Sequence, residues 1–255
     1  MTMTETLIKV DKLYKRFGQN QVLSDISFEV KKHRSLVVMG SSGTGKSVLL
    51  KIMCGLLEAS SGRVLIRNIE VKSKEREHYF ALLQKVGFLF QSGALFDSLN
   101  ILDNITFFVE RLYPLNDKEK KELAEEALEK VGLSENVLFS HPKELSGGMQ
   151  KRVALARAIC HKPEIIFFDE PTTGLDPIMS NLINNLITQI SEKLNVTTIT
   201  ITHDMNSVRM IADDIILLHK GSIVWQGQNK EIDSSDNPYL KQFIHGLAEG
   251  PIQPF

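Results

Sequence analysis

Runs of apolar residues predict the strands of this chain. Short apolar segments bounded by turn residues are typical of strands, and segments that are apolar nearly throughout, such as LVV and IIFF, are typical of strands covered on both faces of a parallel sheet. On this basis we expect strands at Leu23–Val30, Ser35–Met39, Val64–Ile66, Val86–Phe90, Ile165–Phe168, Val196–Thr202, Ile215–Leu218 and Ser222–Gln226. Helical patterns separate several of these segments, so the sequence predicts an α/β protein.

Apolar residues at helical spacing predict the helices. The segments are Ser47–Leu56, Asp117–Val131, Gly148–Cys160 and Pro238–Leu247. In front of the second of them, Asn116 and Glu119 stand at the spacing of a capping box, and Gly132 is a typical residue for its C-terminal end. These signals place both ends of that helix.

The middle third of the chain differs from its flanks. From about Ser92 to Pro163 the pattern shows helices and loops but no convincing strand. We therefore expect residues 92–163 to form an α-helical subdomain inserted into a core that contains the sheet. Residues 1–91 are expected to form the first part of that core, and residues 164–255 the second part with a closing strand and helix.

Composition narrows the class of protein. With 255 residues, 42% of them hydrophobic and 24% charged, the chain is typical of a folded globular protein. Thirty basic residues against 31 acidic ones give a formal net charge of −1, so no overall field favours nucleic acid or an acidic membrane surface. Cys54 and Cys160 form no CxxC pair, which argues against a disulfide scaffold or a zinc cluster and for two reduced, buried thiols.

Neither a membrane-spanning segment nor a signal peptide is predicted. No apolar stretch approaches the ~20 residues that span a bilayer. The first residues, MTMTETLIKVDK, include two acidic side chains and no apolar core. If the protein serves a membrane, we expect it to do so from the cytosolic side and through a partner.

A glycine-rich segment directly after the expected strand SLVVM fits the phosphate-binding pattern GxxxxGKS/T completely and opens a predicted helix. Glycines let successive backbone N–H groups converge on phosphate oxygens, and the helix N-terminus adds positive potential. We expect Lys46 to reach the β- and γ-phosphates of a nucleotide and the Ser47 hydroxyl to ligate Mg²⁺. The segment, called the phosphate loop below, consists of Gly40, Ser41, Ser42, Gly43, Thr44, Gly45, Lys46 and Ser47.

Two adjacent carboxylates, Asp169 and Glu170, end the apolar run IIFF. Parallel sheets bind ligands at the carboxyl ends of their strands, so this acidic pair should face the phosphate loop. Alone, an apolar run that ends in two carboxylates is better explained as a solvated strand end. Together with the phosphate loop, the pair predicts that Asp169 holds Mg²⁺ and that Glu170 deprotonates an attacking water. His203 ends the next strand, where a surface role and contact with the γ-phosphate are about equally expected.

Six residues between the phosphate loop and the acidic pair decide the family. Leu145-Ser146-Gly147-Gly148-Met149-Gln150 resembles the signature of ATP-binding cassette (ABC) ATPases. The family's other motifs follow in order: Phe17 looks like the aromatic residue that stacks on adenine, Gln91 like the Q-loop glutamine, Gly174-Leu175-Asp176 like the D-loop, and His203 like the switch histidine. The resemblance covers essentially the whole chain.

The resemblance implies an α/β P-loop NTPase of the ABC ATPase type, in which a RecA-like mixed sheet core with an N-terminal antiparallel β region carries the inserted helical subdomain. It also implies ATP and Mg²⁺ as cofactors and a head-to-tail homodimer, in which the signature of one subunit closes over the nucleotide held by the other. The implied catalytic residues are Glu170, His203, Lys46 and Gln91, and the implied metal ligands are Ser47, Gln91 and Asp169. The implied nucleotide-binding residues are Phe17, Gly40, Ser41, Ser42, Gly43, Thr44, Gly45, Lys46, Ser47, Val48, Gln91, Ser146, Gly147, Gly148 and Asp176.

Two positions differ from the simplest assignment. Tyr14 competes with Phe17 for adenine, although Phe17 immediately precedes the glycine where the family's aromatic residue sits. Met149 replaces the glutamine that is common at the fifth signature position. Because the phosphate contacts come from the serine and the glycines, we expect activity to survive this replacement.

A narrower resemblance lies in the phrase QSGALFDSL, residues Gln91–Leu99, which is similar to that of ATPases in Mla/Mce-type lipid transport systems. The phrases PTTGLDPI and FIHGLAEGP also look like that group. The group implies an ATPase bound peripherally at the cytoplasmic face of the inner membrane, with a permease, an Mce-domain protein and often a STAS-domain protein as partners. It implies transport of phospholipids or related hydrophobic molecules and no nucleic-acid partner.

Other branches of the family are less consistent with the sequence. A single cassette argues against the translation factors, and the absence of coiled-coil heptads argues against the chromosome proteins. Two alternatives stay open because they share every catalytic motif. One is the ATPase of an importer for amino acids or another polar solute, and the other is an ABC-type ATPase that acts without a permease.

Overall fold

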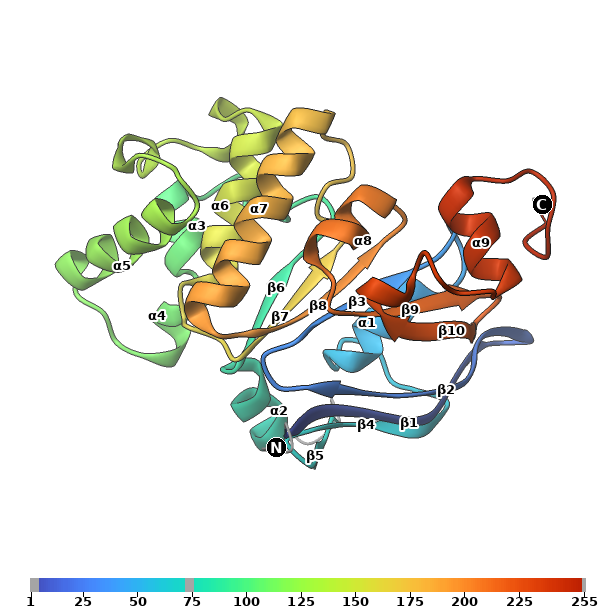
Figure 1. The fold of residues 1–255 in the computed structure, drawn as a ribbon. Helices are drawn as coiled ribbons and strands as arrows, with labels where there is room; N and C mark the ends of the chain where they lie inside the picture. Colours follow the sequence, from blue (N-terminus) through green and yellow to red (C-terminus); the bar gives the residue numbers. More distant parts are fainter. Residues whose placement is uncertain (1–4, 72–75, 254–255) are drawn as a thin grey trace. The chain divides into compact units, whose positions relative to one another are not determined.

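The computed structural model describes residues 5–71 and 76–253, and the chain divides into two compact units (Figure 1). The first unit comprises Met1–Phe80 and Thr197–Phe255, and the second comprises Ala81–Val196. The phosphate loop belongs to the first unit, whereas the signature and the acidic pair belong to the second.

An antiparallel sheet in the first unit has the strand order β2-β1-β4-β5. Its strands are β1 Thr6–Phe17, β2 Asn20–Lys31, β4 Ser61–Ile66 and β5 Ile69–Glu70. Ile8, Val10 and Leu13 of β1 are buried, whereas charged residues of the same strand reach solvent. The sheet therefore has one face in the core and one face in water.

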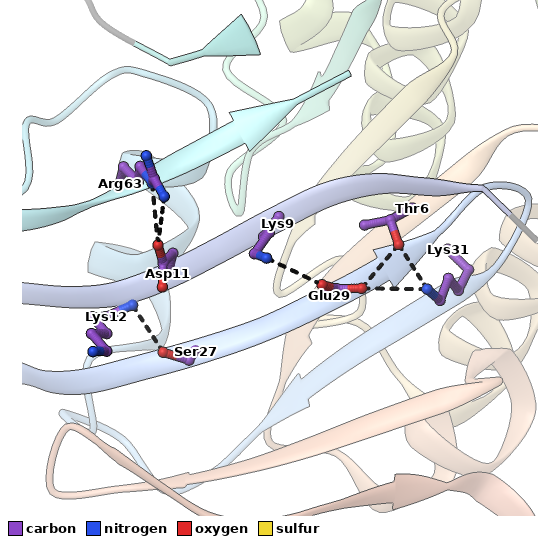
Figure 2. Close-up of polar contacts among 8 residues, drawn as sticks. All are labelled: Thr6, Lys9, Asp11, Lys12, Ser27, Glu29, Lys31 and Arg63. Carbon is purple, nitrogen blue, oxygen red and sulfur yellow. Dashed lines mark hydrogen bonds and ion pairs between the residues drawn. The ribbon is translucent and has the colours of Figure 1, made fainter. Parts of the chain in front are cut away.

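Charged side chains connect β1 and β2 on the solvent side (Figure 2). Glu29 accepts a hydrogen bond from the Thr6 hydroxyl at 2.9 Å and pairs with Lys31 at 3.3 Å and with Lys9 at 3.6 Å. The hydrogen bond from Thr6, together with Lys31, lowers the pKa of Glu29. Water screens such exposed pairs, so each adds little to stability, and their effect is to keep this face of the sheet polar.

The remaining strands of the first unit lie side by side in the order β10-β9-β3-β8. They are β3 Ser35–Met39, β8 Thr197–Thr202, β9 Asp214–His219 and β10 Ser222–Gln228. Strand β3 is parallel to both neighbours, with Met39 opposite Thr202 on one side and Leu217 on the other. The carboxyl ends of β3, β8 and β9 therefore lie at the same edge of the sheet.

Four helices accompany these strands: α1 Lys46–Met53, α2 Arg76–Leu83, which contains the boundary between the units, α8 Met205–Ile211 and α9 Pro238–His245. A short 3₁₀ turn, Asn229–Glu231, follows β10. After α9 the chain folds back, because Gln242 accepts a hydrogen bond from the Ile252 N–H at 2.7 Å and donates to the carbonyls of Leu247 and Ile252. The segment with the sequence FIHGLAEGP is thus held against α9 by hydrogen bonds of Gln242.

The second unit contains two parallel strands and a group of helices. The strands are β6 Val86–Leu89 and β7 Ile165–Asp169, and the helices are α3 Ile101–Thr106, α4 Val109–Leu112, α5 Asp117–Lys130, α6 Gly147–Ile159 and α7 Pro177–Leu194, with 3₁₀ turns at Glu135–Val137 and Pro142–Glu144. Helices α3, α5 and α6 pack on one another. Strand β7 is buried throughout, as its apolar run predicts.

The hydrophobic pattern located most of these elements. Each expected strand and helix corresponds to an observed one, with ends that differ by up to three residues. The expected capping box of α5 is confirmed, since Asn116 accepts from the Glu119 N–H and Glu119 accepts from the Asn116 N–H. The pattern did not assign seven other elements, namely β1, β5, α2, α3, α4, α7 and α8. Charged residues interrupt the apolar pattern in β1, and asparagines interrupt it in α7.

The unit boundaries fall elsewhere than the boundaries expected from sequence. The second unit includes β6, β7 and α7 together with the helices of residues 92–163. A separate helical subdomain of residues 92–163 stays a prediction. Cys54 and Cys160 are both buried, as expected. Among residues 5–71 and 76–253, no helix is both long enough and apolar enough to cross a bilayer.

Candidate functional site

The phosphate loop connects the end of β3 to the start of α1, and its backbone requires glycine at two positions. A Cβ atom on Gly40 would lie 2.3 Å from the carbonyl oxygen of Leu218, and one on Gly45, whose φ is 102°, would lie 2.8 Å from Leu23. The first neighbour is a main-chain atom, and at Gly45 the main-chain oxygen of Val22 would lie 3.0 Å away in addition to the positive φ. The loop therefore approaches its surroundings more closely than any side chain would allow.

Lys46 is held inside this loop by main-chain carbonyls. Its ammonium group donates to Gly40 at 2.7 Å and to Ser41 at 2.9 Å, and the side chain is 6% exposed. The Thr44 hydroxyl donates to the same Ser41 carbonyl at 2.9 Å. These contacts place a positive charge at the N-terminal end of α1, where backbone N–H groups already favour an anion.

His203 lies at the same sheet edge as the phosphate loop. It follows Thr202, which is opposite Met39 in the parallel pair of β8 and β3, and its side chain is exposed. Asp204 caps α8 by accepting from the N–H groups of Asn206 and Ser207, and its own N–H donates to the Thr202 hydroxyl. These hydrogen bonds fix the connection from β8 to α8, and His203 lies within this fixed turn.

The hairpin of β1 and β2 presents Phe17 at its tip, opposite Asn20. The ring is 47% exposed, and the Lys15 ammonium lies 4.8 Å from the ring centre. Tyr14, by contrast, lies within the sheet opposite Ser61 and is half-buried. An exposed ring on a hairpin tip suits stacking on a planar base, and it favours Phe17 over Tyr14.

A pocket of about 860 Å³ opens beside the phosphate loop, a feature that the sequence did not predict. One wall is the loop from Ser41 to Thr44, and the other includes Phe243, Leu247 and Ile252 from α9 and the residues after it. Helix α9 and the residues after it therefore lie close to the phosphate loop.

In the second unit, the acidic pair lies at the end of β7. Asp169 and Glu170 are 8% and 9% exposed, so both carboxylates are buried at a strand end. The Thr173 hydroxyl donates to Glu170 Oε2 at 3.1 Å. Glu170 has a φ of 48°, a left-handed conformation that is uncommon for this residue type and that concentrates at functional sites.

Gln91 comes from the neighbouring strand. Leu89 of β6 is opposite Phe168 of β7, so Gln91 leaves the sheet at the same end as the acidic pair. Its carbonyl accepts a hydrogen bond from the buried ammonium group of Lys151. Burial lowers the pKa of Lys151, and the charges of Asp169 and Glu170 oppose this shift. Sequence reasoning missed Lys151, although a lysine inside the apolar pattern of α6 was a detectable signal.

The signature forms the N-terminus of α6. Ser146 is the N-cap residue, and its hydroxyl oxygen accepts from the Met149 N–H at 3.3 Å, which leaves the hydroxyl hydrogen able to donate. A Cβ atom on Gly147 would meet nothing within 4 Å, whereas one on Gly148 would lie 2.2 Å from Met179 Cε. The helix end is therefore open on the side of Gly147.

Asp176, in the D-loop, caps α7 by accepting from the N–H groups of Ile178 and Met179. Helices α6 and α7 pack side by side (Figure 1), and Met179 bridges their N-terminal ends through its contact with Gly148. The signature and the D-loop thus form one surface of the second unit.

The predicted site residues therefore form three groups. Within the first unit, the phosphate loop and His203 share a sheet edge, and Phe17 is exposed on a hairpin tip. Within the second unit, Gln91 and the acidic pair share the end of a strand pair, and Ser146 to Gly148 adjoin the turn with Asp176. The catalytic, nucleotide-binding or metal-binding role of each of these residues stays a prediction.

Residues 23–173 match the sequence pattern of a family described as ABC transporter. This segment contains the phosphate loop, the signature and the acidic pair in that order. The chain belongs to the ABC transporter family. As an ABC-type ATPase it binds and hydrolyses ATP.

Named relatives are similar over nearly the whole chain. Protein TRIGALACTOSYLDIACYLGLYCEROL 3, chloroplastic, of Arabidopsis thaliana is 37% identical over 98% of this chain and 76% of its own length. The probable ribonucleotide transport ATP-binding protein mkl of Mycobacterium leprae is 35% identical over 96% and 70%. The intermembrane phospholipid transport system ATP-binding protein MlaF of Haemophilus influenzae is 34% identical over 98% and 95%.

A solved ABC ATPase has the same fold. The dimeric structure of a post-hydrolysis state of the ATP-binding cassette MJ0796, bound to ADP and Pi, superposes with a TM-score of 0.80 at 30% identity, covering 88% of this chain and 99% of that one. The α/β fold of the ABC ATPase type expected from sequence is therefore confirmed.

Proposed function

We propose that this ABC ATPase is the motor subunit of a transporter that moves phospholipids or related hydrophobic molecules through a separate permease. The observation that carries the proposal is the combination of a complete set of ABC motifs with the phrase QSGALFDSL. Two relatives support the cargo, because the name of one specifies phospholipid transport and the name of the other a glycerolipid. The relative named for ribonucleotide transport supports a polar-solute transporter as the second candidate.

Nucleotide binding is assigned to the first unit. The amides of the phosphate loop and of Val48 bind the phosphates of ATP, and the Lys46 ammonium exchanges its carbonyl partners for phosphate oxygens. The exposed ring of Phe17 stacks on adenine.

The residues proposed as metal ligands suit Mg²⁺. Ser47, Gln91 and Asp169 supply a hydroxyl, an amide carbonyl and a carboxylate, all of them hard oxygen donors that this ion prefers. Mg²⁺ neutralises charge on the phosphates during their transfer. We propose Mg²⁺ as the physiological metal.

Hydrolysis is assigned to Glu170 as the base. The carboxylate accepts a proton from the water that attacks the γ-phosphorus, while the bond to the β-phosphate oxygen breaks and ADP leaves. Its hydrogen bond from Thr173 and the turn at φ 48° orient the group. His203 hydrogen-bonds the γ-phosphate from its turn after β8.

Two identical active sites are expected in a head-to-tail homodimer. The hydroxyl of Ser146 and the N–H groups of Gly147 and Gly148 at the start of α6 bind the γ-phosphate of ATP held by the other subunit, and Asp176 contacts the same interface. The open surface at Gly147 and the dimeric state named for the MJ0796 structures support this arrangement.

The segment after Gln91 is proposed as the docking surface for the permease. Phe96 is 41% exposed, and its ring lies 4.3 Å from that of Phe107, on which the Arg111 guanidinium stacks at 3.5 Å. Aromatic residues and arginine are typical of interface centres. The protein then lies peripherally at the cytoplasmic face of the inner membrane, with Mce-domain and STAS-domain proteins in the complete complex and no nucleic acid.

Affinity purification of tagged protein from detergent-solubilised native membranes tests this proposal. We expect wild-type protein to recover a permease, an Mce-domain protein and phospholipid. Phe96→Asp should lose the permease but keep ATP hydrolysis, whereas the control Phe139→Asp, at a 68% exposed residue outside the docking segment, should keep both.

The outcomes separate the candidates. A permease for polar solutes would replace the lipid assignment with the second candidate. Recovery of no membrane protein with the wild-type chain would contradict the motor function and favour an ABC-type ATPase that acts without a permease.

A further inference from the structure

The loop that follows β6 is attached to α6 through its main chain. The Lys151 ammonium donates to the carbonyl of Gln91, and the Arg157 guanidinium donates to the carbonyls of Gly93 at 2.6 Å and Ala94 at 2.7 Å. Both cations belong to the helix that begins at the signature. Three carbonyls of a four-residue segment are therefore held by one helix.

The backbone of this loop is shaped for the contact. Gly93 and Ala94 have φ values of 76° and 48°, two successive left-handed residues. A Cβ atom on Gly93 would lie 3.4 Å from Ala154 Cβ, so the loop rests directly on α6. A guanidinium presents its N–H groups as a rigid fork that can take two neighbouring carbonyls, which a lysine ammonium does less precisely.

Stability alone does not explain the burial of Arg157. Burial lowers the pKa of Arg157 to about 10. Its hydrogen-bond partners in the described part of the chain are the main-chain carbonyls of Gly93 and Ala94, and no carboxylate there forms an ion pair with it. A guanidinium that is removed from water without an ion pair disfavours folding, so its place against this loop needs another benefit.

We propose that Arg157 and Lys151 are positioning residues for Gln91. They hold the main-chain carbonyls of Gln91, Gly93 and Ala94 in place. The exposed Gln91 side chain is thereby kept beside the acidic pair at the end of β7. Asn104 extends the attachment, because its buried amide bonds both the N–H and the carbonyl of Phe96. The inference rests on the proposed role of Gln91 as a ligand of Mg²⁺.

Steady-state ATP hydrolysis by the full-length protein tests the inference, with Arg157→Gln as the variant. We expect kcat to fall about tenfold and the Mg²⁺ concentration for half-maximal activity to rise, while KM for ATP changes little, since the phosphate loop and Phe17 are untouched. Arg157→Lys should show a smaller loss. The matched control is Arg152→Gln, in the same helix, whose guanidinium donates to Gly132 at 3.0 Å and not to the loop.

A double-mutant cycle separates positioning from a structural effect. In a Gln91→Ala background, Arg157→Gln should lower kcat no further, because the side chain that it positions is gone. An additive loss in that background, or an equal loss with Arg152→Gln, overturns the inference. If Gln91→Ala alone leaves kcat and the Mg²⁺ requirement unchanged, the proposed role of Gln91 fails, and the inference falls with it.

Hydrogen exchange keeps the inference testable when turnover is too slow to measure. The amides of residues 91–100 should exchange faster in Arg157→Gln than in the wild-type protein and in Arg152→Gln. Unchanged exchange in this segment, with the variant folded, contradicts the attachment.

Discussion

Lys46 and Glu170 show how the chain orients single side chains before any ligand contact. Lys46 is held at 2.7 and 2.9 Å by carbonyls of its own loop, and these are weak partners compared with phosphate oxygens. Glu170 accepts a hydrogen bond from the Thr173 hydroxyl and has a left-handed backbone conformation. Such a conformation is unfavourable by about 1 kcal/mol or more, so the surrounding structure must stabilise it. Both residues are buried, so neither has to give up much solvent on binding.

Replacement of Lys46 tests the proposed role of this side chain in ATP binding. Lys46→Ala removes the cation from the phosphate loop and should weaken ATP binding on the order of 100-fold, the value of one or two charge-assisted hydrogen bonds. Isothermal titration with a non-hydrolysable ATP analogue measures the change. The control Lys51→Ala removes an exposed lysine of the same helix and should bind normally. Near-normal affinity in Lys46→Ala would show that the loop amides alone hold the phosphates.

At the scale of elements, α6 has two separate tasks. Its N-terminus carries Ser146 and the signature glycines, and its side chains Lys151 and Arg157 hold the loop after β6. A rigid helix with both attachments links the proposed docking segment to the surface that is expected to meet the other subunit.

The cap of α5 gives an element-scale prediction for stability. Asn116→Ala removes the side chain that accepts from the Glu119 N–H, and it should lower the free energy of unfolding by about 1 kcal/mol. Urea unfolding followed by circular dichroism measures it. Lys118→Ala, at the solvent-exposed second residue of the same helix, is the control and should change stability by less than about 0.5 kcal/mol. If both substitutions lowered the free energy of unfolding equally, the loss in Asn116→Ala would not come from the cap.

Sequence reasoning succeeded where the signal is local. The strands SLVVM and IIFFD are almost entirely apolar and are buried throughout, and the phosphate loop and the capping box each lie within a few neighbouring residues. It failed where the signal is distributed. Strand β1 alternates charged and apolar residues because only one of its faces is buried, and the contact of Arg157 with Gly93 joins residues 64 positions apart. No pattern along the chain encodes such a pair.

At the scale of the whole molecule, each unit contains some of the residues that are proposed to bind and hydrolyse ATP. The first holds the phosphate loop, His203 and Phe17, and the second holds Gln91, the acidic pair and the signature. The signature is open at Gly147, where a Cβ atom would meet nothing within 4 Å. In a head-to-tail dimer it would bind the nucleotide of the other subunit, so that ATP joins the two chains and hydrolysis separates them.

Sedimentation of Glu170→Gln with and without MgATP tests this dimer most directly. The substitution keeps the shape of the side chain but removes the base, so hydrolysis should fall about 100-fold while ATP still binds. We expect a monomer without nucleotide that becomes a dimer with MgATP, and a monomer under both conditions when Ser146→Arg is added, although that double variant still binds ATP. A Glu170→Gln protein that binds ATP and stays monomeric, or that hydrolyses ATP at the wild-type rate, would contradict the two composite active sites.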